Sequence, residues 1–517
     1  MKRQLFVRTA SAILASLMLL TTIACGSSNQ GKDDTAATTS INSTTPSNSK
    51  VTSFSDMASS DAVTQPTGPA VDANGYELDD LPDDLNYNNA TVTFLTWEDV
   101  EHEEFFVESQ NGDVVNDAMY TRQQIVEERL GIRIEEIMTK GNASYTSNWL
   151  SYVQNDNMSG SHAFDMMAGY SQSIGSTTAR NLCYDLLSEE CSYLNFDKPW
   201  WPDALIDQVT IKDKLFFASG DISMNVLYMM YVCFVNNDLL EAYHLENPAE
   251  LVQSGKWTYD KFIEMCSGVY SDLDGNGEKN QGDQFGYLTC DIHADPWFYA
   301  SGALVVDKDE NGALRPAPSY SGERVISTIE KLNTLLHASN DGIYIAKKAQ
   351  VQTEFRDGRV LFVTDRARAS FNTIAENTAL SYSIVPAPKF DEEQENYYTV
   401  MGNPFTCYAA PADSTDPARA AAVLECFASE SHRLTTPAVF EITLKLKYSQ
   451  NEISAQMYDV IRSSVVFDIG RMFKQELIDL SYFRTCLATN NNDWVSMTKA
   501  NLPVLAKKLA ILEAVFE

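Results

Sequence analysis

Strand and helix patterns alternate at the beginning of the folded part of the chain, and this alternation restricts the fold more than any other feature. Residues 90–97 alternate apolar and polar side chains and are rich in strand-forming residues, and residues 132–137 resume that extended pattern. Apolar residues at helical spacing predict a helix over 115–130 and another around 149–153, and residues 163–168 predict a buried strand. This βαβαβ order indicates a mostly parallel sheet with helices on its faces.

Later segments have the same character, so the sequence predicts an α/β protein throughout. Ligands of such sheets bind beyond the carboxyl ends of the strands, and Trp97 and Tyr170 lie at or just past two of those ends. About 430 residues follow the N-terminal region, which is more than one hydrophobic core usually serves, so we expect two lobes. Further predicted elements are strands at 232–235 and 360–363 and helices at 259–270 and 417–429.

The first residues have the layout of a secretory signal peptide. Three basic residues precede an apolar run over 10–20, which is too short to span a bilayer as a mature helix. Residues 22–26 resemble a bacterial lipobox, except that Thr22 replaces the usual large aliphatic residue. We therefore expect residues 1–24 to be removed and Cys25 to carry a lipid that holds the protein on the outer face of the cell membrane. An ordinary signal peptide with a chance cysteine is the alternative.

A low-complexity segment follows the lipid site. Residues 26–84 are mostly Ser, Thr, Asn, Gly, Ala and Asp, so they cannot bury enough apolar surface to offset their own ordering entropy. We predict that residues 25–86 form a lipidated, disordered tether. A flexible chain of about 60 residues has a root-mean-square length of roughly 40–45 Å, which keeps the folded part close to the membrane.

The charge balance limits the partners. With 38 basic and 71 acidic side chains the net charge is −33, which argues against nucleic acid and anionic headgroups. The acidic residues are spread along the chain, as on a solvated surface, and we expect a monomer. Beyond Cys25 there are eight cysteines, which is no disulfide framework in so long a chain. We expect at most one bridge, for which Cys183 and Cys191 are the candidates.

Residues 272–283 have the spacing of an EF-hand-type calcium loop. Counting from Asp272, oxygen ligands stand at the first, third, fifth and twelfth positions, a glycine stands at the sixth, and a backbone carbonyl is supplied at the seventh. We therefore expect a structural calcium ion and no organic cofactor. The alternative is an Asp- and Gly-rich surface turn that binds nothing. The predicted ligands are Asp272, Asp274, Asn276, Glu278 and Asp283.

Signatures of catalysis are missing from the sequence. It contains no G-x-S-x-G elbow, P-loop or complete G-x-G-x-x-G, and residues 102–106 lack the second histidine of a zincin helix. No pair of carboxylates stands out for glycoside hydrolysis. We therefore expect a binding protein that is not an enzyme.

Aromatic residues beside polar ones mark several predicted loops, among them Trp97-Glu98, Trp200-Trp201 and residues 293–299. Flat aromatic faces next to hydrogen-bonding groups suit sugar rings, whose faces are apolar and whose edges carry hydroxyls. For each tryptophan alone, packing in the core is the alternative role. As a set near predicted strand ends, they favour a polar, uncharged ligand.

Several short motifs, in this order, make the chain similar to the extracellular solute-binding proteins of ABC importers. The resemblance is to the carbohydrate-type family 1, which includes maltose-binding protein, and it covers nearly the whole folded part. The motifs are Phe164-Asp165-Met-Met-Ala-Gly169, Lys198-Pro199-Trp200-Trp201, Gly220-Asp221, Phe234-Val-Asn236-Asn237, Gly255-Lys-Trp257, Phe355-Arg-Asp-Gly358, Ile384-Val-Pro386, Tyr397-Tyr398-Thr and Phe467-Asp468.

The resemblance implies a type II periplasmic-binding fold, in which two α/β lobes close on a ligand about a hinge. By analogy, lobe one comprises residues 87–220 and 400–448, and lobe two comprises residues 221–399 and 449–517. A protein of this kind captures a carbohydrate, here expected to be an oligosaccharide, and delivers it to an ABC permease. By the same analogy, the cleft-facing residues are Trp97, Glu98, Tyr170, His293, Asp295, Trp297, Asp365 and Arg366.

Two other functions remain open at this point. A surface glycoside hydrolase requires two carboxylates roughly 5–10 Å apart across a cleft. A receptor for peptides or other solutes, or a binder coupled to a sensor, requires the same fold with a different ligand.

Overall fold

The computed structural model describes residues 69–99, 104–447, 452–478 and 480–517. The predicted signal peptide, Cys25 and the tether up to residue 68 lie outside the described residues. The described chain contains a four-stranded sheet, a five-stranded sheet and two strand pairs. We call the part built on the four-stranded sheet lobe one and the part built on the five-stranded sheet lobe two.

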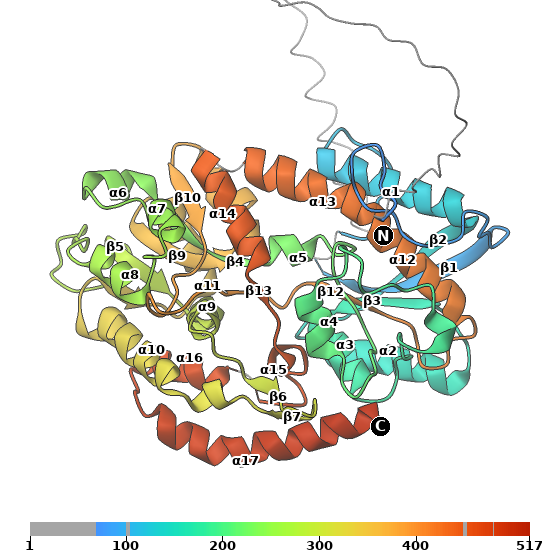
Figure 1. The fold of residues 1–517 in the computed structure, drawn as a ribbon. Coiled ribbons are helices and arrows are strands. Elements are labelled where there is room, and N and C mark those ends of the chain that lie inside the picture. The colour runs from blue at the N-terminus through green and yellow to red at the C-terminus, as the bar shows by residue number, and fades with distance from the viewer. Residues whose placement is uncertain (1–68, 100–103, 448–451, 479) are drawn as a thin grey trace, which may run out of the picture. The chain divides into compact units, whose positions relative to one another are not determined.

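The sheet of lobe one has the strand order β12-β3-β1-β2, with β1 parallel to both β2 and β3 and β12 antiparallel to β3. The predicted βαβαβ unit is therefore confirmed. Figure 1 shows α1 and α12 on one side of this sheet and α2 and α3 on the other. The elements are β1 (Ala90–Glu98), α1 (Val114–Leu130), β2 (Ile132–Lys140), α2 (Thr146–Ser159), β3 (Met166–Tyr170), α3 (Ser171–Thr178), α4 (Asp203–Val209), β12 (Thr406–Ala409) and α12 (Pro417–Arg433).

Helix α1 shows why the ends of a helix could be predicted from the sequence. The carboxylate of Asp113 accepts the backbone N–H groups of Val115 and Asn116, which caps the free donors of the first turn. Gly131 ends the helix in the left-handed conformation, with φ of 57°, and strand β2 begins at the next residue.

The sheet of lobe two has the order β10-β4-β9-β5-β8, in which β5 is parallel to β8 and β9, and β4 is antiparallel to β9 and β10. The helix predicted over 259–270 ends at Cys266, because Gly268 adopts a φ of 77° that a helix cannot continue. The elements are β4 (Tyr231–Asn236), α6 (Asn237–Ala242), α7 (Pro248–Gln253), α8 (Tyr259–Cys266), β5 (Phe285–Thr289), α9 (Asp295–Ala300), β6 (Val306–Lys308), β7 (Leu314–Pro316), α10 (Glu323–Asn333), β8 (Gly342–Tyr344), α11 (Lys348–Arg356), β9 (Val360–Arg366), β10 (Tyr382–Val385), α14 (Glu452–Ser463), α16 (Ser481–Ala488) and α17 (Trp494–Glu513).

Three segments carry the chain between the lobes. The first contains α5 (Asn225–Tyr228) and the second contains β11 (Thr399–Val400). The third contains α13 (Thr435–Pro437) before the lobe-two helix α14, and β13 (Val465–Val466) and α15 (Ile469–Met472) after it. Strands β11 and β13 pair in parallel, so the second and third segments form one short ribbon, which we call the crossing strands.

The lobes also touch through the C-terminal part of the chain. A Cβ at Gly175 of α3 would lie 2.3 Å from the carbonyl oxygen of Met472, so α3 and α15 approach as closely as a glycine permits. Phe516 follows α17, and the centroid of its ring lies 5.0 Å from the ring centroid of Phe216 in lobe one. Figure 1 shows α17 running from lobe two towards lobe one.

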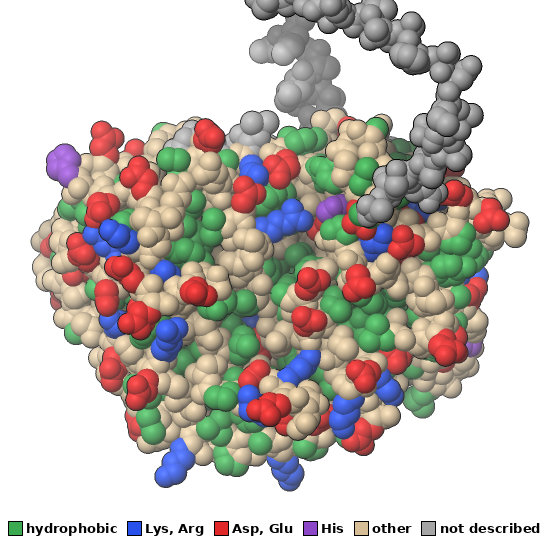
Figure 2. Space-filling model, viewed as in Figure 1, with side chains coloured by type: hydrophobic (Ala, Val, Ile, Leu, Met, Phe, Trp, Pro, Cys, Tyr) green, Lys and Arg blue, Asp and Glu red, His purple; other side chains and the backbone are tan. Residues whose placement is uncertain are grey.

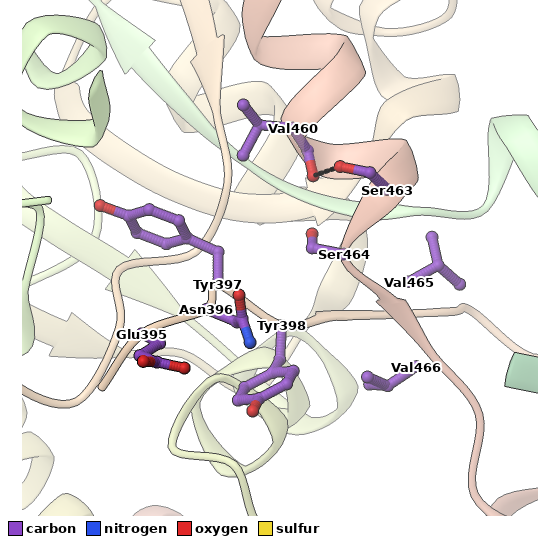
Figure 3. A pocket seen from close by; sticks show the side chains of 9 residues that line it. All are labelled: Glu395, Asn396, Tyr397, Tyr398, Val460, Ser463, Ser464, Val465 and Val466. Carbon is purple, nitrogen blue, oxygen red and sulfur yellow. Dashed lines mark hydrogen bonds between the residues drawn. The ribbon is translucent and has the colours of Figure 1, made fainter.

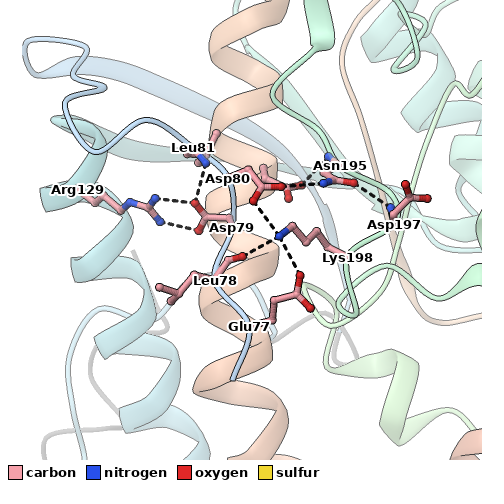
Figure 4. A network of polar contacts seen from close by, with 10 residues as sticks. Glu77, Leu78, Asp79, Asp80, Leu81, Arg129, Asn195, Asp197 and Lys198 are labelled. Atoms are coloured by element: carbon pink, nitrogen blue, oxygen red, sulfur yellow. Dashed lines mark hydrogen bonds and ion pairs between the residues drawn. The ribbon is translucent and has the colours of Figure 1, made fainter. Parts of the chain in front are cut away.

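The end of the predicted tether is packed against lobe one, which shortens the tether. Asp79 pairs with both terminal nitrogens of Arg129 at 2.6 Å, and Lys198 donates to Glu77, to the carbonyl of Leu78 and to Asp80. Figure 4 shows this segment lying across α12, with Arg129 on one side and Lys198 on the other. We call residues 77–81 the strap. Its polar composition resembles that of the tether, but its charges are matched by partners on lobe one.

The remaining cysteines and the surface agree with the expectations. All eight cysteines of the described chain are buried free thiols, so Cys183 and Cys191 are not bridged. Acidic and basic side chains are interspersed over the face shown in Figure 2. Within the described ranges, no helix is both long and apolar enough to cross a bilayer.

Candidate functional site

Trp97 and Tyr170 lie together at two strand ends of lobe one. Trp97 is the last residue but one of β1 and Tyr170 ends β3, and their rings meet edge to face with centroids 5.2 Å apart. The indole N–H of Trp97 donates to the hydroxyl of Thr406, at the start of β12, at 2.9 Å. Both rings are buried, whereas Glu98 is exposed. The structure thus joins two of the predicted site residues and leaves the third on the surface beside them.

Glu104 lies behind this pair and was not predicted from the sequence. Its carboxylate accepts the hydroxyl of Ser223 at 2.8 Å and the backbone N–H of Asn225 at 2.7 Å, and it also accepts the hydroxyl of Thr406. Ser223 and Asn225 belong to the first crossing segment. The polar chain from Trp97 through Thr406 to Glu104 therefore ties the strand ends of lobe one to the crossing region.

In lobe two, Asp295 is fully buried at the start of α9 and is held by two arginines. Its oxygens lie 2.7 Å from Nη1 of Arg471 and 2.7 and 2.8 Å from Nε and Nη2 of Arg484. Burial by itself would raise the pKa of Asp295, but the charges and hydrogen bonds of Arg484 and Arg471 outweigh it and lower the pKa below its usual value. Asp295 is therefore ionised and its charge is matched.

His293 precedes Asp295 by two residues and lies beside Asp365. Nδ1 of His293 is 2.8 Å from the carbonyl oxygen of Thr364 and 3.4 Å from the carboxylate of Asp365. Asp365 also accepts the side-chain amide of Gln352 at 2.6 Å and the backbone N–H of Arg366 at 2.7 Å. Burial lowers the pKa of His293, more than the nearby Asp365 raises it, so the ring is neutral.

The hydrogen bond to Thr364 fixes the tautomer of His293. A carbonyl can only accept, so Nδ1 carries the proton and Nε2 is left with a lone pair. This buried Nε2 has no hydrogen-bond partner among the residues that the structure describes. The ring is fully buried, so this Nε2 is an unused acceptor inside lobe two.

Two predicted site residues have other surroundings. Trp297 packs in the core of lobe two, with its ring centroid 4.8 Å from those of Tyr259 and Phe262, and its N–H donates to the hydroxyl of Tyr287 at 2.7 Å. The side chain of Arg366 lies over Gly402 in the second crossing segment, where a Cβ on the glycine would be 2.8 Å from Cδ of the arginine. The surroundings of Trp297 match the core-packing role that the sequence left open as its alternative, and the ligand-contact role of Arg366 stays a prediction.

A small hollow of about 10 Å³ marks the place where the crossing strands, lobe one and α15 meet. Asn403 and Phe405 enter it from the lobe-one side, and their carbonyls accept hydrogen bonds from the hydroxyl and the N–H of Ser171 in α3. Asp468 and Arg471 enter it from the other side. The segment that leads into β12 and the helix α15 thus flank one hollow beside the crossing strands.

A larger pocket of about 380 Å³ lies beside the same strands, and we call it the hinge pocket. Figure 3 shows α14 on one side of it, Glu395 and Tyr398 on the other, and the strand β13 closing it. Its lining residues are Glu395, Asn396, Tyr397, Tyr398, Val460, Ser463, Ser464, Val465 and Val466.

Three carboxylates of the predicted calcium loop come together. Carboxylate oxygens of Asp272, Asp274 and Asp283 lie within 4.8 Å of one another. Asp272 also accepts the N–H groups of Gly275 and Gly277 at 2.7 Å, which folds the loop around it. Asn276 accepts the N–H of Glu278 at 2.6 Å. Three carboxylates with neighbouring amide and carbonyl oxygens are a hard donor set, which fits calcium.

The comparisons with known proteins agree with this geometry. Among solved structures, a cyclo/maltodextrin-binding protein in complex with maltotetraose is 12% identical, with a TM-score of 0.53 over 82% of this chain and 97% of that one. A maltose-binding periplasmic protein from Listeria monocytogenes in complex with maltose is 14% identical (TM-score 0.51; 83% and 98% covered). A sugar transporter from Rhizobium etli in an open conformation is 13% identical (TM-score 0.53; 81% and 99% covered).

These likenesses establish the fold, in which two α/β lobes are joined by crossing segments. None of the curated proteins gives a match. The family model described as bacterial extracellular solute-binding protein matches residues 138–435, which is more than half of the chain. The chain therefore belongs to the bacterial extracellular solute-binding protein family.

Proposed function

We propose that this protein captures an oligosaccharide between its two lobes and delivers it to the permease of an ABC transporter. The observation that carries the proposal is the fold, which is shared over four-fifths of the chain with proteins whose structures contain maltose or maltotetraose. Membership of the solute-binding family supports an extracellular location and a role in binding.

The chemistry at the strand ends supports a neutral, hydroxyl-bearing ligand. Asp295 lies 2.7 Å from both Arg471 and Arg484, and Asp291 lies 4.0 Å from Arg484. In this cluster two carboxylates balance two arginines and leave a charged ligand no surplus charge to pair with. Nε2 of His293 offers an acceptor to a hydroxyl. The rings of Trp97 and Tyr170 are buried in this structure and would give a sugar apolar surface in an arrangement that uncovers them. A sugar needs both kinds of contact.

The mechanism that we propose is a population shift without turnover. A sugar that contacts both lobes binds the closed arrangement better than the open one, and it shifts the equilibrium by that difference in affinity. The glycoside hydrolase alternative predicts instead that an oligosaccharide is cut.

Thermal unfolding of the purified protein against a panel of oligosaccharides, monosaccharides and peptides tests the proposal. A ligand that binds only the folded state at 100 times its Kd stabilises by about 2.7 kcal/mol, which is a clear shift in melting temperature. We expect oligosaccharides to give the largest shift and to be recovered uncut. A rise in melting temperature with peptides alone would mean that the protein binds peptides and not oligosaccharides. Release of shorter sugars would favour the glycoside hydrolase.

We also propose that Cys25 is lipidated and holds the protein on the outer face of the cell membrane. The support is the signal-like sequence before Cys25 and the family's extracellular role. Replacing Cys25 with Ser is expected to move the protein into the medium or the soluble fraction. A variant that stays in the membrane after washing would contradict the anchor.

A structural calcium ion in the loop over 272–283 is our third proposal. The ligand spacing and the three gathered carboxylates support it. The ion would hold the loop that connects α8 to β5 and would take no part in ligand capture.

A further inference from the structure

The hinge pocket contains hydrogen-bonding groups that the protein itself leaves unused. Within the described residues, the exposed side chains of Glu395 and Asn396 and the half-buried side chain of Tyr398 make no hydrogen bond to another protein group. The adjacent Tyr397 behaves differently, because its ring is buried and its hydroxyl donates to the carbonyl of Val252 at 3.4 Å. Successive side chains of an extended segment point to opposite sides. The ring of Tyr397 therefore packs in the core, whereas the ring of Tyr398 faces the pocket.

Apolar and hydroxyl groups face these polar side chains. Val465 and Val466 are half-buried in β13, and Val460 lies above them on α14. The hydroxyls of Ser463 and Ser464 donate to the carbonyls of Val460 and Ile461 at 3.1 and 3.0 Å. The hydroxyl of Ser464 also lies 2.9 Å from that of Thr399, whereas Ser463 keeps its oxygen lone pairs for another donor. The pocket therefore combines an aromatic ring, an aliphatic wall and mixed donors and acceptors.

Size and charge narrow the class of ligand. A volume of about 380 Å³ is at the small end of the roughly 300–1,000 Å³ that is typical of ligand pockets. The lining contains one carboxylate and no lysine or arginine, which disfavours an anion. A single ring with an apolar face and several hydroxyls matches this lining, whereas a long oligosaccharide exceeds it.

We propose that the hinge pocket is a second binding site, which takes one neutral hexose ring. The inference rests on the proposed function for the sugar class, but it concerns a different place in the fold. The region between the lobes is bordered by the strand ends of both lobes, whereas the hinge pocket is lined only by the segments that enter the crossing strands and by those strands themselves. A ring bound there contacts both the segment before β11 and the strand β13, which pair through Thr399 and Val465.

Saturation-transfer NMR with glucose as the probe tests the site in the presence of saturating maltotetraose, which on the proposed function occupies the region between the lobes. Ser463→Trp fills the pocket from its exposed rim, and Tyr398→Ala removes the ring, so the test does not depend on one variant folding well. Ser151→Trp is the matched control, because Ser151 is also an exposed helical serine whose hydroxyl bonds a carbonyl of its own helix, at 2.8 Å.

We expect the wild type and Ser151→Trp to retain the glucose signal under maltotetraose, and Ser463→Trp and Tyr398→Ala to lose at least about four-fifths of it. A glucose signal that maltotetraose abolishes in the wild type, or one that both pocket variants keep, would overturn the second site. Failure of the proposed function looks different, because then maltotetraose and the other sugars shift the melting temperature of neither the wild type nor any variant.

Discussion

Asp295 and Arg484 form a two-bond ion pair, with distances of 2.7 and 2.8 Å, around a carboxylate that has no exposed surface. Arg471 adds a third bond at 2.7 Å. Arg484 and Arg471 are 189 and 176 positions away from Asp295 in sequence, so the cluster ties α9 to α16 and to α15 of the third crossing segment. Breaking a buried pair leaves uncompensated charge, which is costly.

Asp295→Asn is therefore expected to lower the free energy of unfolding by about 3–5 kcal/mol, as is typical when one partner of a buried ion pair is removed. Asp307→Asn is the control, because Asp307 pairs with Arg315 at 3.0 Å on the surface, and such pairs contribute about 0–1 kcal/mol. Denaturant unfolding measures both. Equal losses in the two variants would contradict the role of the cluster.

Trp297→Ala is expected to cost about 3–5 kcal/mol of folding free energy, because it leaves a cavity among Tyr259, Phe262 and Tyr287. The affinity of the folded protein for its sugar should hardly change. Unfolding midpoints and ligand titrations on the same variant check this. A large loss of affinity with unchanged stability would mean that Trp297 contacts the ligand.

Glu425 makes stability depend on pH in lobe one. Burial raises its pKa to about 7, although the indole N–H of Trp201 bonds the carboxylate at 3.0 Å. The folded state therefore keeps a proton that the unfolded chain releases near its ordinary value of 4.5, so stability falls as pH rises from there to about 7. Glu425→Gln should remove this decline.

The expected gain of Glu425→Gln is up to roughly 3 kcal/mol at pH 8 and close to zero at pH 4. The measurement is denaturant unfolding of wild type and variant across this pH range, compared as a difference so that other carboxylates cancel. A difference that stays constant with pH would mean that Glu425 does not titrate there.

Asp79→Asn tests whether the strap belongs to the folded part. The carboxylate of Asp79 is almost fully buried, and although burial raises its pKa, the hydrogen bonds and charge of Arg129 lower it further, to below the usual value. Its contribution to stability is thus present at neutral pH and lost as pH falls through the folded-state pKa. We expect the variant to lose about 1–3 kcal/mol at pH 7.

The control for the strap is Glu135→Gln, because the pair between Arg133 and Glu135 has a similar distance of 2.7 Å but both side chains are more than half exposed. Its loss should be under about 0.5 kcal/mol. If Asp79→Asn and Glu135→Gln unfold at the same midpoint, the strap is only an extension of the tether.

Calcium is expected to stabilise the loop over 272–283 by mass action. A chelator should lower the melting temperature of the wild type and leave that of Asp274→Ala unchanged, because Asp274 is one of the three gathered carboxylates. Asp309→Ala, in an Asp-rich turn at the β6–β7 hairpin, is the control that should still respond. Identical melting curves of the wild type with and without chelator would contradict the proposed calcium site.

Much of the fold could be predicted because its signals are local. The period of apolar residues, the cap at Asp113 and the glycine at 131 lie within the segments that they define. The strap could not be predicted in this way. Glu77, Asp79 and Asp80 look like solvated tether residues until Arg129 and Lys198 are placed beside them by the tertiary structure.

The candidate site was predicted less completely for the same reason. Nothing local relates Asp295 to Arg471 or Arg484, and Glu104 is a buried carboxylate in a chain with many exposed ones. Trp297 stands two residues after Asp295, but at 3.6 residues per turn two positions are about 200° apart on a helix. One side chain therefore faces the ion pair while the other faces the core.

The most direct test of the proposed receptor function is a calorimetric titration of the purified protein with the oligosaccharide that raises its melting temperature most. We predict saturable binding, with the sugar recovered at its original length and the affinity retained in Trp297→Ala. The absence of saturable binding to any oligosaccharide in the panel, or recovery of shortened sugar, would contradict the claim that this protein is a carbohydrate receptor.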